Sequence, residues 1–348
     1  MTLTRRSGLR LLGGAATAAL LGPVLACGSR RLSSAGDGSR PRRVALLQYR
    51  ESLPLQLTRD AFVASLAARG FPEGPRLQLV RRDAGGSQRR CRRLAAELVG
   101  ARPDLLVALG TPSLMAAIAE APSSLPIVFS YCSNPWAAGA GQSAHQHRHN
   151  VTGTVSTNPV DQQLQLARTL LPELTQVGLL YNPAEANAGF EAELLAQAAG
   201  AQQVQLLREP VAQPADLPLA WERLRRGQVQ ALMQVGDYTT QQGFARLAEL
   251  AWAARLPLFG VDPAFAGLRG CLAVVGWDPC RDGRQAGALA ARVLGGTPPA
   301  ELPFERPGTP QVWLNAVTAR HLGLSLPPAL LAESTQVTAA ATAAASCD

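Results

Sequence analysis

Residues 105–129 read LLVALGTPSLMAAIAEAPSSLPIVF and alternate between strand and helix patterns. The apolar run at 105–109 is continuous, as in a parallel strand that is buried on both faces. Gly110 permits a sharp turn, Thr111 is a favoured N-cap residue, and Pro112 suits the first helical position. The predicted helix therefore directs its N-terminus past the carboxyl end of the strand, where open α/β sheets bind ligands.

A second stretch, residues 231–261, repeats this pattern and reads ALMQVGDYTTQQGFARLAELAWAARLPLFGV. An apolar strand is followed by a turn at Gly236 and Asp237, a helix predicted at 241–254, and another strand. The two stretches are too far apart for a solenoid repeat. They predict two similar α/β lobes whose helix N-termini face a shared small ligand.

The composition limits the classes of function. The 348 residues, 47% of them hydrophobic, are sufficient for one large or two medium domains. All 33 basic residues are Arg, which excludes a lysine Schiff base and a Walker-type phosphate loop. Eight of these arginines lie in residues 1–43, and the remaining chain carries 25 Arg against 24 acidic residues. The seven arginines of residues 76–93 are a weak signal on a solvated helix start, so we expect no nucleic-acid partner.

The N-terminus has the pattern of an export signal. In residues 1–27, Arg5-Arg6 precedes an apolar run that is too short for a comfortable membrane span. The arginine pair resembles a twin-arginine (Tat) signal, and an ordinary secretory (Sec) signal is the alternative. Residues 24–27, VLAC, resemble a bacterial lipobox, which predicts cleavage and lipidation at Cys27; the alternative is an ordinary signal peptide with a chance cysteine. The Ser-, Gly- and Arg-rich residues 28–43 are predicted to be a flexible tether.

From residue 44 onward strands and helices alternate, which predicts parallel sheets with right-handed crossovers. The fold class expected is α/β, with two similar doubly wound parallel-sheet lobes joined by hinge crossovers. We assign the first lobe to residues 44–157 with about 279–310, and the second to 158–278 with about 311–333. Residues 334–348, rich in Ala, Thr and Ser, are predicted to be a disordered tail.

Short motifs fall in order along residues 44–333. They are Arg102-Pro103-Asp104 with Gly110-Thr111-Pro112, Leu125-Pro126-Ile127-Val128-Phe129, Asn134-Pro135 with Gly139, Asn150-Val151-Thr152-Gly153, Tyr181-Asn182-Pro183, Leu256-Pro257-Leu258-Phe259, Gly283-Arg284-Gln285-Ala286, and Leu322-Gly323-Leu324. In this combination the chain resembles bacterial ABC-transporter substrate-binding proteins of the group that includes tryptophan- and tyrosine-binding members. The resemblance implies a type I periplasmic-binding fold, a small-molecule ligand between the lobes, and an ABC permease partner. It implies neither a cofactor nor catalysis, and we expect a monomer.

In the first lobe, the resemblance assigns an anionic ligand group, such as a carboxylate, to Thr111, Pro112 and Ser113 at the helix start. Asn134 stands where the family usually has Asp. The missing charge weakens recognition of a ligand amine by this lobe, and it favours a neutral or anionic group there or leaves the amine to Asp237.

In the second lobe, Glu185 and Asn187 match a Glu-x-Asn segment of the family, and Asp237 matches an Asp at a strand end. Asp278 matches an acid that follows a strand, although Pro279-Cys280 replaces its usual aromatic neighbour. The aromatic candidates for contact with a planar ligand are Trp277, Tyr238, Tyr131 and Trp136. Each of these residues also has a purely structural interpretation. The acids, Asn187 and Thr111 could cap helices or pair between the lobes, and the aromatic residues could belong to the core.

Two further features have open interpretations. His145, His147 and His149 would share one face of an extended strand and could bind Zn, Ni or Cu, or they belong to a polar surface loop. Cys271 and Cys280 are the closest cysteine pair in sequence, but sequence does not establish connectivity.

The sequence thus predicts an extracytoplasmic, membrane-anchored solute-binding lipoprotein of an ABC importer. It would capture an amino-acid-like molecule or an aromatic carboxylate. No nucleophile, base and acid stand in motif spacing, which favours binding over catalysis. The alternatives are a ligand-sensing accessory lipoprotein and, less favoured, a metal-binding protein that uses the three histidines.

Overall fold

The computed structural model describes residues 40–337 and 347, and all of these belong to one compact unit. The predicted signal segment with Cys27 lies outside the described residues, as does most of the predicted tether. The tether prediction extends slightly too far, because the first strand already begins at Arg42. No helix within the described residues is both long and apolar enough to cross a membrane.

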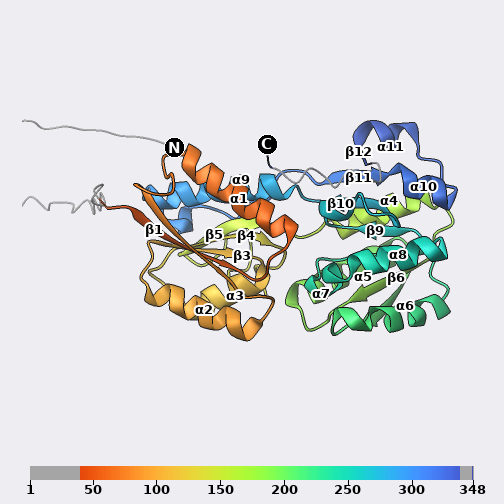
Figure 1. The fold of residues 1–348 in the computed structure, drawn as a ribbon, viewed down its shortest axis with the longest axis horizontal. Coiled ribbons are helices and arrows are strands. Elements are labelled where there is room, and N and C mark those ends of the chain that lie inside the picture. The colour runs from red at the N-terminus through yellow and green to blue at the C-terminus, as the bar shows by residue number, and fades with distance from the viewer. Residues whose placement is uncertain (1–39, 338–346, 348) are drawn as a thin grey trace, which may run out of the picture. The chain divides into compact units, whose positions relative to one another are not determined.

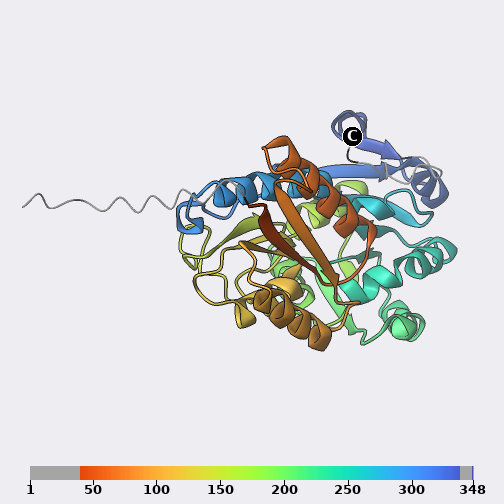
Figure 2. The same ribbon diagram turned by 60° about the vertical axis from the view of Figure 1, so that its left-hand side comes forward.

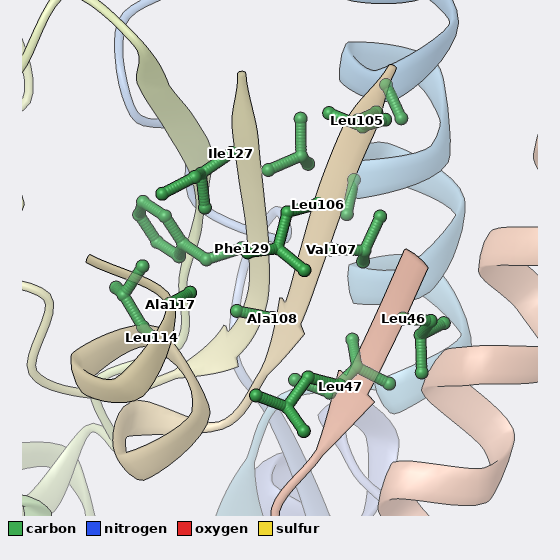
Figure 3. Close-up of a cluster of buried hydrophobic side chains, with 14 of the residues drawn as sticks. Leu46, Leu47, Leu105, Leu106, Val107, Ala108, Leu114, Ala117, Ile127 and Phe129 are labelled. Atoms are coloured by element: carbon green, nitrogen blue, oxygen red, sulfur yellow. The ribbon is translucent and has the colours of Figure 1, made fainter. Parts of the chain in front are cut away.

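The first lobe is built on a five-stranded parallel sheet (Figure 1). Its strands lie in the order β2-β1-β3-β4-β5. Their bounds are β1 Arg42–Gln48, β2 Leu77–Asp83, β3 Leu105–Leu109, β4 Ile127–Cys132 and β5 Val151–Val155. Every residue of the central strand β3 is buried, as its continuous apolar run predicts. Figure 3 shows leucines of β1 and β3 packing with Ile127 and Phe129 of β4 and with Leu114 and Ala117 of the following helix.

Helices cover both faces of this sheet (Figures 1 and 2). These are α1 Leu53–Ala68, α2 Gln88–Gly100, α3 Thr111–Glu120 and α9 Pro279–Leu294, with the short turn η3 Pro299–Glu301. α1 and α9 lie side by side on one face, and α2 and α3 lie on the other. α9 can approach α1 because of Gly283, where an added Cβ would lie 2.9 Å from the Cβ of Ala61. A helix that is remote in sequence thus completes the first lobe.

The second lobe contains a seven-stranded sheet in the order β12-β11-β10-β9-β8-β6-β7. The strands are β6 Gln176–Tyr181, β7 Gln205–Pro210, β8 Ala231–Met233, β9 Leu258–Gly260, β10 Cys271–Gly276, β11 Gln311–Asn315 and β12 Thr335–Val337. All neighbours are parallel except β10 and β11, which are antiparallel. The predicted disordered tail is therefore wrong at its start, because backbone pairing with β11 makes residues 335–337 a strand.

The helices of the second lobe are α4 Val160–Leu170, α5 Ala186–Ala201, α6 Leu217–Arg226, α7 Tyr238–Gln242, α8 Phe244–Ala254, α10 Ala316–Leu322 and α11 Pro328–Glu333. Two short turns, η1 Pro214–Asp216 before α6 and η2 Pro263–Phe265 between β9 and β10, complete the lobe. The helix predicted at 241–254 is instead two helices separated at Gly243, and the first begins earlier because Asp237 caps it. The predicted class is confirmed: each lobe is an α/β sheet with a largely parallel ladder.

The chain crosses between the lobes after β5, after β10 and before β11. Two contacts tie these crossings together. The indole Nε1 of Trp277 donates to the carbonyl of Thr157 over 2.8 Å, and Thr154 on β5 pairs with Glu305 on the returning chain. The lobes therefore share a hinge made of three adjacent segments.

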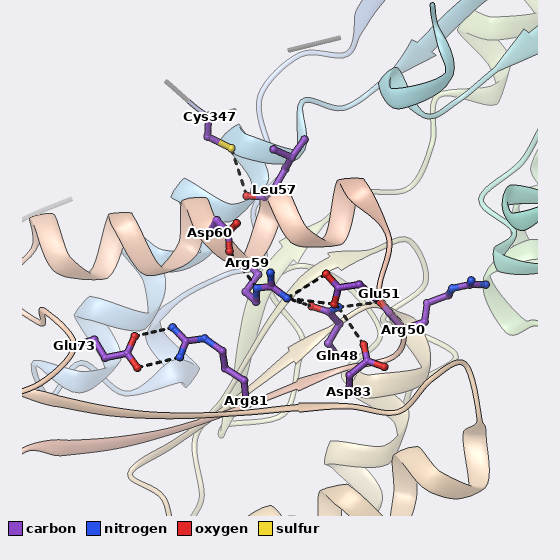
Figure 4. A network of polar contacts seen from close by, with 10 residues as sticks. All are labelled: Gln48, Arg50, Glu51, Leu57, Arg59, Asp60, Glu73, Arg81, Asp83 and Cys347. Carbon is purple, nitrogen blue, oxygen red and sulfur yellow. Dashed lines mark hydrogen bonds and ion pairs between the residues drawn. The ribbon is translucent and has the colours of Figure 1, made fainter. Parts of the chain in front are cut away.

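Polar contacts surround the outer edge of the first sheet (Figure 4). The side-chain amide of Gln48 donates to Glu51 and Asp83, and Arg81 forms a two-pronged ion pair with Glu73. Arg92 and Arg93 of the Arg-rich segment likewise pair with acids. These ion pairs reduce the free positive charge of the one basic stretch that raised the question of nucleic acid.

The disulfide joins Cys280 to Cys347, whose Cα atoms are 5.4 Å apart. Cys271, which is closest to Cys280 in sequence, is buried and unpaired. Sequence proximity does not place it within reach, since Cys271 lies inside the second sheet and Cys280 at the start of α9. The Cys347 sulfur also lies 3.4 Å from the carbonyl oxygen of Leu57 (Figure 4), so the chain's end packs on α1.

Candidate functional site

A cavity of about 50 Å³ lies where strands of both sheets end. It is lined from the first lobe, the hinge and the second lobe. The lining residues are Thr111, Tyr131, Ser133, Ser156, Asn158, Asn187, Gln234, Val235, Gly236, Asp237, Tyr238, Gln241, Val261, Asp262 and Trp277. We call this the cleft cavity. It occupies the edge that the two strand-to-helix joints predict.

The first joint, between β3 and α3, forms one wall. Gly110 has φ 91° and ψ 154°, a region that is essentially restricted to glycine, and it is the N-cap of α3. Thr111 is therefore the first helical residue rather than the cap that the sequence predicts, because the chain turns one residue earlier. Its hydroxyl accepts from the backbone N–H of Asn134 over 3.3 Å and lies 3.4 Å from the sulfur of Cys132.

Tyr131 enters the cavity at the end of β4 with a left-handed backbone, φ 52°. Its N–H donates to the carboxylate of Asp282 over 3.2 Å. The same carboxylate accepts from the hydroxyls of Ser130 over 2.9 Å, Thr154 and Ser156. Burial raises the pKa of Asp282, and the hydroxyl donors oppose that shift. This acid on α9 thus fixes the ends of β4 and β5 beside the cavity.

Asp237 caps α7 on the second lobe. Its carboxylate accepts from the N–H of Thr240 over 2.8 Å and from the N–H of Asn182. Burial raises the pKa of Asp237 to about 7, and the charge of Glu185 adds to the increase. Glu185 itself turns to the N–H groups of Tyr238 and Thr239, 2.8 and 3.0 Å away. It lines a separate groove rather than the cleft cavity.

A third buried acid, Glu191, supports the floor of the cavity. Its carboxylate accepts from Asn158 over 3.0–3.1 Å and from the N–H of Gly236. Burial raises the pKa of Glu191. Asn187 donates its amide to the carbonyl of Gly236, whereas its oxygen Oδ1 is buried with no donor. The structure thus leaves one hydrogen-bond acceptor in the lining unused.

Three aromatic residues line the cavity: Tyr131, Tyr238 and Trp277. Tyr238 crosses from the second lobe and packs against Tyr49 of the first, with ring centroids 5.0 Å apart. Trp277 is held by its bond to Thr157 in the hinge. Trp136 lies outside the cavity, stacked on Phe304 at 5.7 Å.

The sequence profile described as "ABC transporter substrate binding protein" matches residues 43–338, which is most of the chain. The chain belongs to the ABC transporter substrate-binding protein family. Proteins of this family are extracytoplasmic, and they bind a small molecule without transforming it. The predicted family and the predicted absence of enzymatic function agree with this match.

Individual proteins resemble this substrate-binding protein over nearly their whole length. A curated relative, a tyrosine-binding protein of Clostridioides difficile (strain R20291), is 23% identical over 288 residues, 83% of each chain. A conserved domain protein from Vibrio cholerae has a TM-score of 0.80 at 29% identity, covering 86% of this chain and all of the other. A Streptococcus pneumoniae ABC domain solved with L-Trp has a TM-score of 0.79 at 24% identity, covering 85% and 99%. The two structural comparisons show that this chain shares the fold of those proteins.

Half of the ten residues that the sequence proposed for ligand contact line the cleft cavity of this substrate-binding protein. These five are Thr111, Asn187, Asp237, Tyr238 and Trp277. The other five lie outside the lining: Pro112, Ser113, Asn134, Glu185 and Asp278. Ligand contact stays a prediction for all ten.

Those outside have defined partners. The hydroxyl of Ser113 is buried 3.8 Å from the sulfur of Cys91. Asn134 links the lobes, because its amide donates to the carbonyl of Ala186 over 3.3 Å. Asp278 caps α9 by accepting from the N–H of Cys280 over 2.8 Å.

The sequence alone did not identify several residues that line the cleft cavity. They are Ser133, Ser156, Asn158, Gln234, Gln241 and Asp262. Asp262 follows strand β9, so the signal that singled out Asp237 would also have found it. Burial raises its pKa to about 6, and the amide of Gln241 donates to it over 2.6 Å.

Two of the three histidines have separate partners. His147 stacks on Phe304 with centroids 4.6 Å apart, and a ring nitrogen of His149 lies 3.1 Å from the carbonyl of Ser123. Within residues 40–337 and 347, no three His, Cys, Asp or Glu side chains are grouped as metal ligands. The geometry therefore gives the metal-binding alternative no support.

Proposed function

We propose that this protein is the solute-binding lipoprotein of an ABC importer, which captures a small amino-acid-like molecule in the cleft cavity and delivers it to a permease. The observation that carries the proposal is the cavity itself, which both lobes and the hinge line with polar and aromatic groups. Relatives described as binding tyrosine or L-Trp support an amino-acid-like ligand. Closure of two lobes about a hinge couples ligand affinity to the population of closed molecules.

Within this proposal, Thr111, Asn187, Asp237, Tyr238 and Trp277 contact the ligand. Thr111 contributes from the first lobe and the other four from the second lobe and the hinge. A ligand that touches both sides stabilises the closed form over the open one. In this proposal the protein acts as a monomer, with one chain lining the cavity.

The proposed lipid anchor rests on the sequence at residues 24–27, VLAC. Cleavage before Cys27 would leave a lipidated N-terminus that holds the protein at the membrane beside its permease. The test is expression of wild type and a Cys27→Ser variant in a bacterial host, with membrane and soluble fractions compared. Wild type should be in the membrane fraction and the variant should lose this location; equal distribution of the two would rule out the anchor.

Ligand capture is tested on the mature protein with a thermal-shift panel of amino acids, aromatic acids, sugars and nucleosides. A ligand at 100 times its dissociation constant should stabilise the folded state by about 2.7 kcal/mol. Native mass spectrometry of freshly purified protein provides a second readout, since a bound ligand adds its own mass. Solution scattering should show compaction with the same compound. A panel without a stabilising member, combined with no bound mass and no compaction, would contradict the proposal.

A further inference from the structure

We infer that the cleft cavity recognises a small organic cation, a protonated amine, and needs no carboxylate on its ligand. This inference rests on the proposed capture of a small solute, and of the amino-acid-like ligand it retains only the ammonium group. Four observations carry it: the charges of the lining, its aromatic residues, one unused acceptor, and the position of the Tyr238 hydroxyl.

The lining carries acidic side chains without a basic one. Asp237 and Asp262 both line the cavity, whereas none of its residues is Arg, Lys or His. Arg50 approaches the same region, but its guanidinium donates to the carbonyl of Tyr238 over 3.1 Å and lines the separate groove. A ligand carboxylate would find no cationic partner in the cavity, while an ammonium group would find two carboxyls.

The aromatic residues suit the same charge. Tyr131, Tyr238 and Trp277 line one cavity from three different segments. The negative face of an aromatic ring attracts a cation, most strongly where the pair is shielded from water. Rings and carboxyls together are the usual surroundings of a bound ammonium group.

The lining also has a vacancy for a hydrogen-bond donor. Asn187 is only 5% exposed, and its Oδ1 has no donor although its amide is bonded to Gly236. A buried acceptor without a partner destabilises the protein, and a hydrogen bond donated by the ligand would remove that cost. An ammonium N–H is such a donor, and a carboxylate is not.

The predicted anion site is obstructed. The sequence placed a carboxylate at the N-terminus of α3, but the Tyr238 hydroxyl lies against Gly110, the cap of that helix.

The test uses three compounds that share one carbon skeleton: valine, isobutylamine, which is valine without its carboxylate, and isovalerate, which is valine without its amine. A second series uses tryptophan, tryptamine and indole-3-propionate. Dissociation constants are measured by calorimetry on the mature wild-type protein. Isobutylamine should bind at least tenfold more tightly than valine, and isovalerate should not bind.

The variants Asp237→Asn and Asp262→Asn should each weaken isobutylamine binding at least tenfold, because each removes a carboxyl group that can pair with the ammonium group and keeps the side-chain shape. Asp161→Asn, the same substitution at an exposed site of α4, is the matched control and should bind as wild type does. Circular dichroism and urea unfolding establish that each variant is folded. The wild-type series keeps the inference testable even if a variant does not fold.

Tighter binding of valine or tryptophan than of the corresponding amine overturns the inference and leaves the proposed function standing. Binding of isovalerate or indole-3-propionate, which have a carboxylate and no amine, also overturns the inference and leaves the proposed function standing. Binding of neither series, with a sugar or nucleoside bound instead, also overturns it. If no compound of the wider panel binds, the proposed function fails as well.

Discussion

The hydroxyl of Tyr238 on the second lobe lies so close to Gly110 on the first that a Cβ atom at residue 110 would collide with it. Gly110 also has φ 91°, which side chains rarely adopt. The contact joins the strand-to-helix joints of both lobes at the cleft cavity. One glycine thus permits both the turn into α3 and the approach of the lobes.

Gly110→Ala should therefore lower the free energy of unfolding by about 2–4 kcal/mol, from backbone strain and overpacking together. Combining it with Tyr238→Phe, which removes the colliding oxygen, should recover part of the loss. Urea unfolding of the two single variants and the double variant measures this coupling. The control is Gly100→Ala, where an added Cβ meets no atom within 4 Å. Strict additivity of the two changes would contradict the contact.

Asp282 is expected to control the shape of the cavity although it does not line it. Asp282→Asn replaces one acceptor oxygen by a donor, and the N–H of Tyr131 cannot turn away as a hydroxyl can. We expect a loss of about 1–3 kcal/mol in stability, together with weaker ligand binding. The milder Ser130→Ala removes one of the four donors and is the comparison. Unchanged stability in the Asn variant would show that the carboxylate is not needed there.

The raised pKa of Asp237, about 7 against 3.8 for a free side chain, predicts a pH dependence of stability. The folded state binds this proton more tightly than the unfolded state, so the contribution is complete below about pH 4 and is lost as the pH rises through about 7. As the pH rises from 4 to 8, Asp237→Asn should therefore gain stability relative to wild type, by at most about 4 kcal/mol. At every pH the variant also loses stability, because its amide replaces one of the two oxygens that accept from backbone N–H groups.

Urea unfolding at several pH values measures this gain, with Asp161→Asn as the exposed control. Glu185 interacts with Asp237, so the observed midpoint belongs to the pair rather than to one residue. A difference between variant and wild type that stays constant with pH would refute the prediction. If the variant instead loses stability relative to wild type as the pH rises, Asp237 is charged and well stabilised in the folded protein.

The parts of this molecule that the sequence predicts are those set by local patterns. The continuous apolar run of β3 and the Gly-Thr-Pro turn specify a buried strand and the start of a helix within eight residues. The partners of Asp282 are not visible in this way, because the hydroxyls it accepts from lie 126–152 residues earlier in the chain. Periodicity shows which face of an element is buried, but not which polar group it meets there.

The same limit applies to the crossing of Tyr238 into the first lobe and to the disulfide. In the sequence, Tyr238 is an aromatic residue near the start of a helix. Nothing in the surrounding residues indicates that Arg50, 188 residues away, donates to its carbonyl. Cysteine spacing suggests the pair that is close in sequence, whereas the fold brings together Cys280 and Cys347. Contacts between lobes depend on how whole elements pack, so they require the three-dimensional structure.

The Cys280–Cys347 disulfide closes 67 residues of chain, including the last crossing and strands β11 and β12. Restricting the unfolded chain over such a loop is expected to contribute about 4 kcal/mol. Cys280→Ser and Cys347→Ser should lower the melting temperature equally, and the double variant should be no less stable than either. Reductant should lower the wild-type melting temperature to that of the variants and leave theirs unchanged. Additive losses would indicate that the cysteines stabilise the fold separately, through packing on α9 and on Leu57.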